Sequence, residues 1–140
     1  EVKNVIAIKE ASGNLEQVMQ IIKYRPKNFA VLSGEDSLTL PIVSAGGDGV
    51  ISVISNEMPK EFSEMVRAAL KGDLKKAQDL HYKMFELMKA NFIESNPIPV
   101  KTALSMMGMI EDNFRLPLTQ MTKYNKEKLR RILKDLKLIK

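Results

Sequence analysis

The sequence of 140 residues contains no cysteine, no tryptophan and a single histidine. Without cysteine, the chain can form no disulfide framework, no thiolate nucleophile and no cysteine-based zinc site. The one histidine, His81, lies in an amphipathic helical stretch with no second histidine to complete a metal site. We expect it to be a surface or boundary residue. These absences exclude thiol chemistry and the usual zinc centres.

Long apolar runs are also absent. No run approaches the roughly 20 residues that a membrane span needs, and the start, EVKN, resembles neither a signal peptide nor a targeting segment. The net charge is +5, and much of the excess lies in KYNKEKLRRILKDLKLIK. Acidic residues are interleaved there and no aromatic platform accompanies them, which favours a solvated helix face over the alternative of a nucleic-acid-binding patch.

The remaining composition, 44% hydrophobic and 28% charged, is that of an ordinary globular domain. The length is about one domain's worth. The chain begins with Glu1 rather than Met, and a strand is predicted within a few residues. We therefore expect it to be a piece of a longer protein.

The first half alternates between two kinds of segment. Apolar runs predict strands over residues 5–11, 29–34 and 50–55, and helical spacing predicts helices over 15–24 and within 37–46. Short apolar strands that alternate with helices indicate parallel strands covered by helices. Three strands are few for a closed sheet, which again suggests missing sequence.

The second half is predicted to be helical. Apolar residues at helical spacing predict a helix over 57–70 and another after Asp73, and a further helix restarts within ESNPIPVKTALSMMGM. The stretch EDNFRLPLTQMT reads as a loop, and a last helix follows it. Asn14, Asp73 and Asn125 are the expected N-caps, because their side-chain oxygens can accept the first free helical N–H groups.

Lys9 ends the first predicted strand. Because side chains alternate along a strand, Val5, Ala7 and Lys9 share one face, and two bulky isoleucines lie on the other. If helices cover the isoleucine face, Lys9 points toward a barrel-like interior and loses hydration, which favours the neutral amine. A neutral amine can attack a carbonyl carbon and form a Schiff base. The alternative is a lysine that extends from the strand end to water.

Two further stretches lie at the other strands. LSGEDS, residues 32–37, ends the second strand, and GGDGVIS, residues 46–52, enters the third. Gly34 would let the backbone come close to a bound molecule. Glu35 and Asp36 have the positions of N-terminal helix charges or caps. The glycines of the third stretch precede a strand rather than open a helix, so a nucleotide-binding loop is not supported.

Taken together, IKEASGN, LSGEDS, GGDGVISV and NPIPVKTAL followed by RLPLT resemble, in order and spacing, the pyruvate-dependent class I aldolase family. The resemblance implies an α/β fold, a (β/α)8 barrel followed by a helical extension. Matched to it, this chain is the C-terminal part, with strands resembling the sixth to the eighth. Residues 1–71 would be the partial barrel and residues 72–140 the extension.

The same resemblance assigns roles to five residues. Lys9 would hold pyruvate as a Schiff base that becomes an enamine, which attacks aspartate-semialdehyde without a metal or organic cofactor. Ile51 would contribute backbone contacts near the Schiff base. Gly34, Glu35 and Asp36 would border the approach of the aldehyde. The tail motifs favour this branch, which serves lysine (diaminopimelate) biosynthesis, over the N-acetylneuraminate lyase branch.

The family's other functional groups lie on earlier strands, and nothing in this sequence matches them. We therefore expect the isolated chain to be inactive and to need the missing N-terminal half of the barrel. The resemblance further implies a cytoplasmic enzyme that forms a homodimer or homotetramer, with no nucleic acid or membrane partner. Two alternatives stay open: another pyruvate-dependent aldolase, and a non-catalytic half-barrel that assembles with itself.

Overall fold

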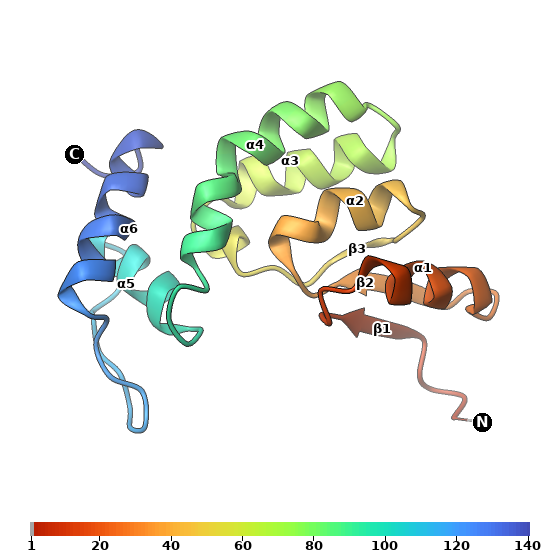
Figure 1. Ribbon diagram of the computed structural model, residues 1–140, viewed down its shortest axis with the longest axis horizontal. Coiled ribbons are helices and arrows are strands. Elements are labelled where there is room, and N and C mark those ends of the chain that lie inside the picture. Colours follow the sequence, from red (N-terminus) through yellow and green to blue (C-terminus); the bar gives the residue numbers. More distant parts are fainter. Residues whose placement is uncertain (1) are drawn as a thin grey trace.

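A computed structural model describes residues 2–140 (Figure 1). Strands and helices alternate in the first third of the chain, and the remainder is helical. The first strand and the last helix lie at opposite ends of the view in Figure 1. In chain order the elements are β1 (Ala7–Glu10), α1 (Leu15–Tyr24), β2 (Ala30–Ser33), the 3-10 helix η1 (Asp36–Leu38), α2 (Thr39–Ser44), β3 (Gly49–Val50), the 3-10 helix η2 (Ile54–Asn56), α3 (Pro59–Leu70), α4 (Leu74–Ala90), α5 (Ile98–Met106) and α6 (Lys123–Asp135).

The three strands form one parallel sheet in the order β1-β2-β3. Lys9 lies opposite Leu32, and Leu32 lies opposite Gly49. Helix α1 connects β1 to β2, and η1 with α2 connects β2 to β3, as parallel pairing requires a crossover between neighbouring strands. The predicted α/β fold with parallel strands is confirmed.

Helix α1 covers the predicted range because both of its ends carry local signals. The side chain of Asn14 accepts hydrogen bonds from the N–H groups of Glu16 and Gln17, at 3.1 and 3.2 Å. The predicted cap is therefore confirmed. The helix stops at Tyr24, ahead of the Arg25-Pro26 step, where the proline restricts the residue before it to extended conformations.

The third strand is shorter than the sequence predicts. Only Gly49 and Val50 pair as a strand, and the chain then bends into η2. The reason is a tertiary contact, because Oδ2 of Asp36 accepts the N–H groups of Val53 at 3.0 Å and Ile54 at 2.8 Å. A carboxylate that takes these two donors caps a helical turn rather than allowing a strand to continue.

Apolar side chains collect in two cores. The smaller core lies between the sheet and the helices α1 and α2, with Val18, Val31 and Ile42 at its centre. The larger core lies among α2, α3, α4, α5 and α6. Its fully buried side chains include Phe62, Met65, Met84, Leu87, Met88, Leu129 and Leu133.

Three expectations about the helical part have different outcomes. Asp73 caps α4, since its side chain accepts the N–H of Lys76 at 3.2 Å. The expectation that Asn125 caps the last helix is wrong: α6 begins at Lys123 with Thr122 as N-cap, and Asn125 lies within the helix. The surface position expected for His81 is also wrong.

His81 is only 5% exposed. It shares the inward stripe of α4 with Ala77 and Met84, which are both fully buried, so packing of that stripe carries the imidazole inside. Burial lowers the pKa of His81 from its usual 6.5. None of the helices within residues 2–140 combines the length and the hydrophobicity needed to cross a lipid bilayer.

Candidate active site at the carboxyl ends of the strands

The carboxyl ends of the three strands are joined by backbone hydrogen bonds. The N–H of Gly34 donates to the carbonyl of Glu10 at 2.6 Å, and the N–H of Ile51 donates to the carbonyl of Ser33 at 2.9 Å. Side chains two residues apart along a strand share a face, so the register places Lys9, Gly34 and Ile51 on the same face of the sheet. Three residues from separate stretches of the sequence therefore meet at one edge.

Gly34 and Lys9 lie in direct contact. A Cβ atom on residue 34 would lie 3.0 Å from Cε of Lys9 and 2.6 Å from Cβ of Ala11. Two non-bonded carbon atoms are most stable about 3.5–4.0 Å apart, so the site has no room for a larger residue at this position. Glycine at position 34 thus leaves the space that the stem of Lys9 occupies.

Lys9 lies on the face of the sheet that no helix of the described chain covers. Within residues 2–140, Lys9 is exposed and Ile51 is 50% exposed. Of the two interpretations, the described chain shows the lysine open to water, because α1 and α2 cover the face of the sheet that carries Val31 and leave the face of Lys9 uncovered.

The turn after β2 is held by hydroxyl groups around Glu35. The Ser33 hydroxyl donates to the Glu35 carbonyl at 2.8 Å and accepts the Glu35 N–H at 3.1 Å. Thr39 donates to the same carbonyl at 3.0 Å, and Ser37 donates to the Glu35 carboxylate at 3.2 Å. The carboxylate is thereby oriented at the edge of the candidate site. Sequence reasoning missed these hydroxyl groups, although their spacing around Gly-Glu-Asp at a strand end was visible.

Asp36 has a different position from the one expected. Its side chain is buried, at 1% exposure, and holds the N–H groups of Val53 and Ile54. Burial raises the pKa of Asp36, against the hydrogen bonds from Ile54, Ser52 and Val53 that favour the charged form. A side chain so occupied does not border the open face. Asp36 instead anchors the segment that follows Ile51.

Glu10, the residue after Lys9, points its side chain to the covered face of the sheet. Its carboxylate is 6% exposed and accepts hydrogen bonds from the Ser12 N–H and from the Gln17 side chain, both at 3.0 Å. These contacts tie the end of β1 to the first turn of α1. The position of Lys9 is therefore set by a buried polar contact that alternation alone did not reveal.

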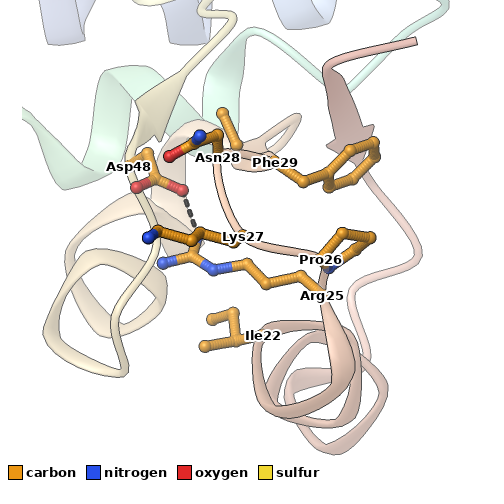
Figure 2. Close-up of a pocket in the computed structure, with 8 residues that line it drawn as sticks. Ile22, Arg25, Pro26, Lys27, Asn28, Phe29 and Asp48 are labelled. Atoms are coloured by element: carbon orange, nitrogen blue, oxygen red, sulfur yellow. Dashed lines mark hydrogen bonds and ion pairs between the residues drawn. The ribbon is translucent and has the colours of Figure 1, made fainter. Parts of the chain in front are cut away.

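A pocket of about 540 Å³ lies at the opposite, amino ends of the strands (Figure 2). Arg25 reaches across it to Asp48, as the dashed line in Figure 2 shows. Asp48 also accepts the N–H of Val31 at 2.8 Å, so its charge is already used to brace β2 against the turn before β3. We assign this pocket a structural role. Within residues 2–140, no group of three or more histidine, aspartate or glutamate side chains could hold a metal ion.

Comparison with known proteins gives a consistent result. A model of the dihydrodipicolinate synthetase family matches residues 1–136. A 4-hydroxy-tetrahydrodipicolinate synthase of Hydrogenobaculum sp. is 55% identical over 137 residues, which cover 98% of this chain and 47% of that protein.

Two crystal structures extend this likeness to the fold. The dihydrodipicolinate synthase of Aquifex aeolicus is 51% identical, superposes with a TM-score of 0.96 and is matched over 99% of this chain and 47% of its own. A chloride-inhibited dihydrodipicolinate synthase of Acinetobacter baumannii, complexed with pyruvate, is 40% identical with a TM-score of 0.95, over 99% of this chain and 48% of its own. The chain spans about half the length of these relatives.

Proposed function

The chain belongs to the dihydrodipicolinate synthetase family, and from that membership we propose that it supplies the lysine-bearing part of a lyase that condenses pyruvate with aspartate-semialdehyde. The product would feed lysine (diaminopimelate) biosynthesis. The observation that carries the proposal is the meeting of Lys9, Gly34 and Ile51 on one face at the strand ends, with Cε of Lys9 against the backbone of Gly34. The related structure complexed with pyruvate supports the choice of the first substrate.

In the proposed reaction, Nζ of Lys9 attacks the ketone carbon of pyruvate, and water leaves as the iminium forms. The iminium withdraws electrons, so a methyl proton is lost and an enamine results. The enamine carbon then attacks the aldehyde. Ile51 would contact pyruvate through its backbone, Gly34 leaves space beside the lysine stem, and Glu35 borders the approach of the aldehyde. No metal or organic cofactor enters the proposal.

We further propose that β1, β2 and β3 correspond to the sixth, seventh and eighth strands of a (β/α)8 barrel. Residues 1–71 would form this C-terminal part of the barrel and residues 72–140 a helical extension. The parallel order and the exposure of Lys9 support this assignment. In such barrels the reacting groups lie at the carboxyl ends of the strands. An N-terminal half would enclose the open face, exclude water and so favour the neutral amine.

It follows that the isolated chain should be inactive and that the complete enzyme should be a cytoplasmic homo-oligomer, a dimer or tetramer. The test is reductive trapping. The chain is incubated with pyruvate and borohydride, alone and mixed with the N-terminal half of the Aquifex aeolicus relative, and the site of modification is found by mass spectrometry. We expect a pyruvyl adduct on Lys9 in the mixture and little or none in the chain alone.

Two variants make this test specific. Lys9→Arg keeps the positive charge but should abolish the adduct, because a guanidinium group is not a nucleophile at neutral pH. Lys3→Arg, at an exposed position near the same strand, should leave the adduct unchanged. An adduct that survives Lys9→Arg would refute the assignment of the nucleophile.

The exposed face also supports a second candidate, a non-catalytic half-barrel that assembles with itself. Exposed apolar residues on this face, such as Val5 and Ile51 at 55% and 50% exposure, would lie in that contact. A stable self-assembly that forms no adduct with any complementing half would favour it. Competition between aspartate-semialdehyde and N-acetylmannosamine as acceptors would distinguish the proposed reaction from that of another pyruvate-dependent aldolase such as N-acetylneuraminate lyase.

A further inference from the structure

Glu57 and Asn91 form a buried polar pair outside the candidate site. Glu57 is 3% exposed and Asn91 is fully buried. The side-chain amide of Asn91 donates to Oε2 of Glu57 at 2.6 Å. Among residues 2–140, the other two oxygens of the pair, Oε1 of Glu57 and Oδ1 of Asn91, have no hydrogen-bond partner. Two unpaired acceptors on adjoining buried side chains are costly unless something donates between them.

A single proton would satisfy both atoms. A carboxylic acid and a primary amide can form a cyclic pair in which the amide N–H donates to one carboxyl oxygen and the acid O–H donates to the amide oxygen. We propose that Glu57 is protonated in the folded chain and that its Oε1–H group donates to Oδ1 of Asn91, so that the two side chains form an uncharged acid–amide pair. This inference does not depend on the proposed function.

The surroundings favour the neutral acid. Burial raises the pKa of Glu57 to about 8, and the nearby carboxylate of Asp36 adds to the rise, while the hydrogen bond from Asn91 opposes it. Asp36 belongs to η1, and its own Oδ2 accepts two backbone N–H groups from the segment that precedes Glu57. Two buried carboxyl groups so placed are more stable when only one of them is charged.

Other charged groups on the neighbouring elements are engaged elsewhere. On α3, Glu61 lies 3.9 Å from Lys83. On α5, Lys101 donates to the carbonyl of Asn113 at 2.5 Å. On α4, His81 precedes Asn91 by ten residues, which is about 15 Å along the helix. No cation on these elements is therefore engaged with Glu57.

The pair has a definite place in the fold. Glu57 follows η2 and donates its N–H to the carbonyl of Ile54 at 3.0 Å, and Asn91 ends α4 with its N–H bound to the carbonyl of Leu87 at 3.0 Å. The pair thus joins the segment after Ile51 to the end of α4. Glu57 and Asn91 are positioning residues for that segment, and their contact depends on one proton.

The proposed proton on Glu57 predicts how the stability of the folded chain changes with pH. Glutamate in the unfolded chain ionises near 4.5, whereas folded Glu57 keeps its proton until about pH 8. Between these values the folded state binds one more proton than the unfolded state, so stability falls as pH rises. The contribution is fully present below about pH 4.5 and is lost by pH 8. Within the window the unfolding constant should rise about tenfold per pH unit from this group alone.

Glu57→Gln is the matched variant, because a glutamine amide can form the same cyclic pair with Asn91 without a titratable proton. The unfolding constant of the full chain is measured by denaturant titration at pH 6.5, 7, 7.5 and 8, at or above the usual pKa of histidine. We expect the ratio of the parent's unfolding constant to that of the variant to rise by close to tenfold per pH unit at the lower values and less steeply as the pH approaches 8. Glu86→Gln, at an exposed position on α4, is the control and should give a constant ratio.

A second measurement uses only the parent chain and tests the proposal even if Glu57→Gln does not fold. The ¹³C resonance of the Glu57 carboxyl group in the parent chain, assigned by selective labelling, should titrate near pH 8. Titration near the ordinary value of 4.5, or equal pH slopes for the parent and Glu57→Gln, would overturn the proposal.

Discussion

The sheet region and the helical region of this molecule bury their apolar residues to different degrees. In the helical region, Met65, Met84 and Leu87 are all fully buried, and the helices satisfy one another. In the sheet region, one face packs on α1 and α2, but on the other face Val5 and Ile51 remain 55% and 50% exposed. Figure 1 shows α3 beside α4, α5 beside α6, and β1 at the lower margin of the sheet.

The difference indicates where further chain is required. A cluster of helices can bury its apolar residues without further chain, because each helix has one apolar stripe that packs against another helix. A parallel sheet has two faces and two edges, and stable parallel sheets are covered on both faces. The uncovered face is the one that carries Lys9, so under the proposed function a segment that covers this face would also complete the candidate site. Four predictions test this contrast, beginning with the largest expected effect.

Truncation of a core residue should separate the two regions most clearly. Leu87→Ala removes a fully buried side chain from α4 and should lower the free energy of unfolding by about 2–5 kcal/mol. Ile51→Ala removes a half-exposed side chain from the open face and should cost less than about 1 kcal/mol in the isolated chain. Chemical denaturation measures both. Equal losses would show that the open face is covered in solution.

Gly34→Ala should disturb the candidate site through packing. The added Cβ would meet Cβ of Ala11 at 2.6 Å and Cε of Lys9 at 3.0 Å, so the strand ends must separate at a cost of about 1–3 kcal/mol. The displacement of Lys9 should also lower the yield of pyruvyl adduct in the complemented chain. Gly13→Ala is the control for the site: its backbone φ of +75° makes alanine costly for stability there, but its Cβ meets nothing within 4 Å, so the adduct should be retained.

Removing a helix cap should cost about the same stability in the sheet region as in the helical region, because a cap contacts only residues near it in the sequence. Asn14→Ala in the sheet region removes the acceptor for the Glu16 and Gln17 N–H groups, and Asp73→Ala in the helical region removes the acceptor for Lys76. Each should cost about 1 kcal/mol, measured by thermal or chemical unfolding. A loss several times larger for one of the two would mean that its side chain has a tertiary role as well.

The smallest effect concerns His81. Burial lowers its pKa, so as pH falls below 6.5 the unfolded chain takes up a proton that the folded chain resists, and stability is lost. His81→Leu removes the titrating group and should reduce the loss of stability between pH 6.5 and 5. Unfolding of the parent and the variant at matched pH measures the difference. A parallel pH dependence for the two would contradict the buried neutral imidazole.

Local pattern accounted for much of the fold. The range of α1 was predicted to the residue, because Asn14 and the Arg25-Pro26 step are signals that act within a few residues of the helix. The predicted caps at Asn14 and Asp73 are confirmed for the same reason. Strand alternation predicted the face of Lys9, the observed register adds Gly34 and Ile51 to that face, and their assigned roles in catalysis stay predictions.

The failures involve contacts between residues far apart in sequence. The third strand ended early because Asp36, 17 and 18 residues before Val53 and Ile54, takes their N–H groups. The cap of α6 moved to Thr122 because Glu94, 28 residues earlier, accepts its N–H and its hydroxyl. No window of local sequence contains both members of such a pair.

Residue type and spacing were thus sufficient for α1, for the caps at Asn14 and Asp73 and for the face on which the candidate nucleophile lies, because those features depend on residues nearby in the sequence. Whether a polar group is buried, paired or open to water was settled only by packing, since solvation depends on every segment that comes near it in space. His81, Asp36 and Glu57 are buried because other segments pack over them, whereas Lys9 is exposed because no described segment covers its face of the sheet.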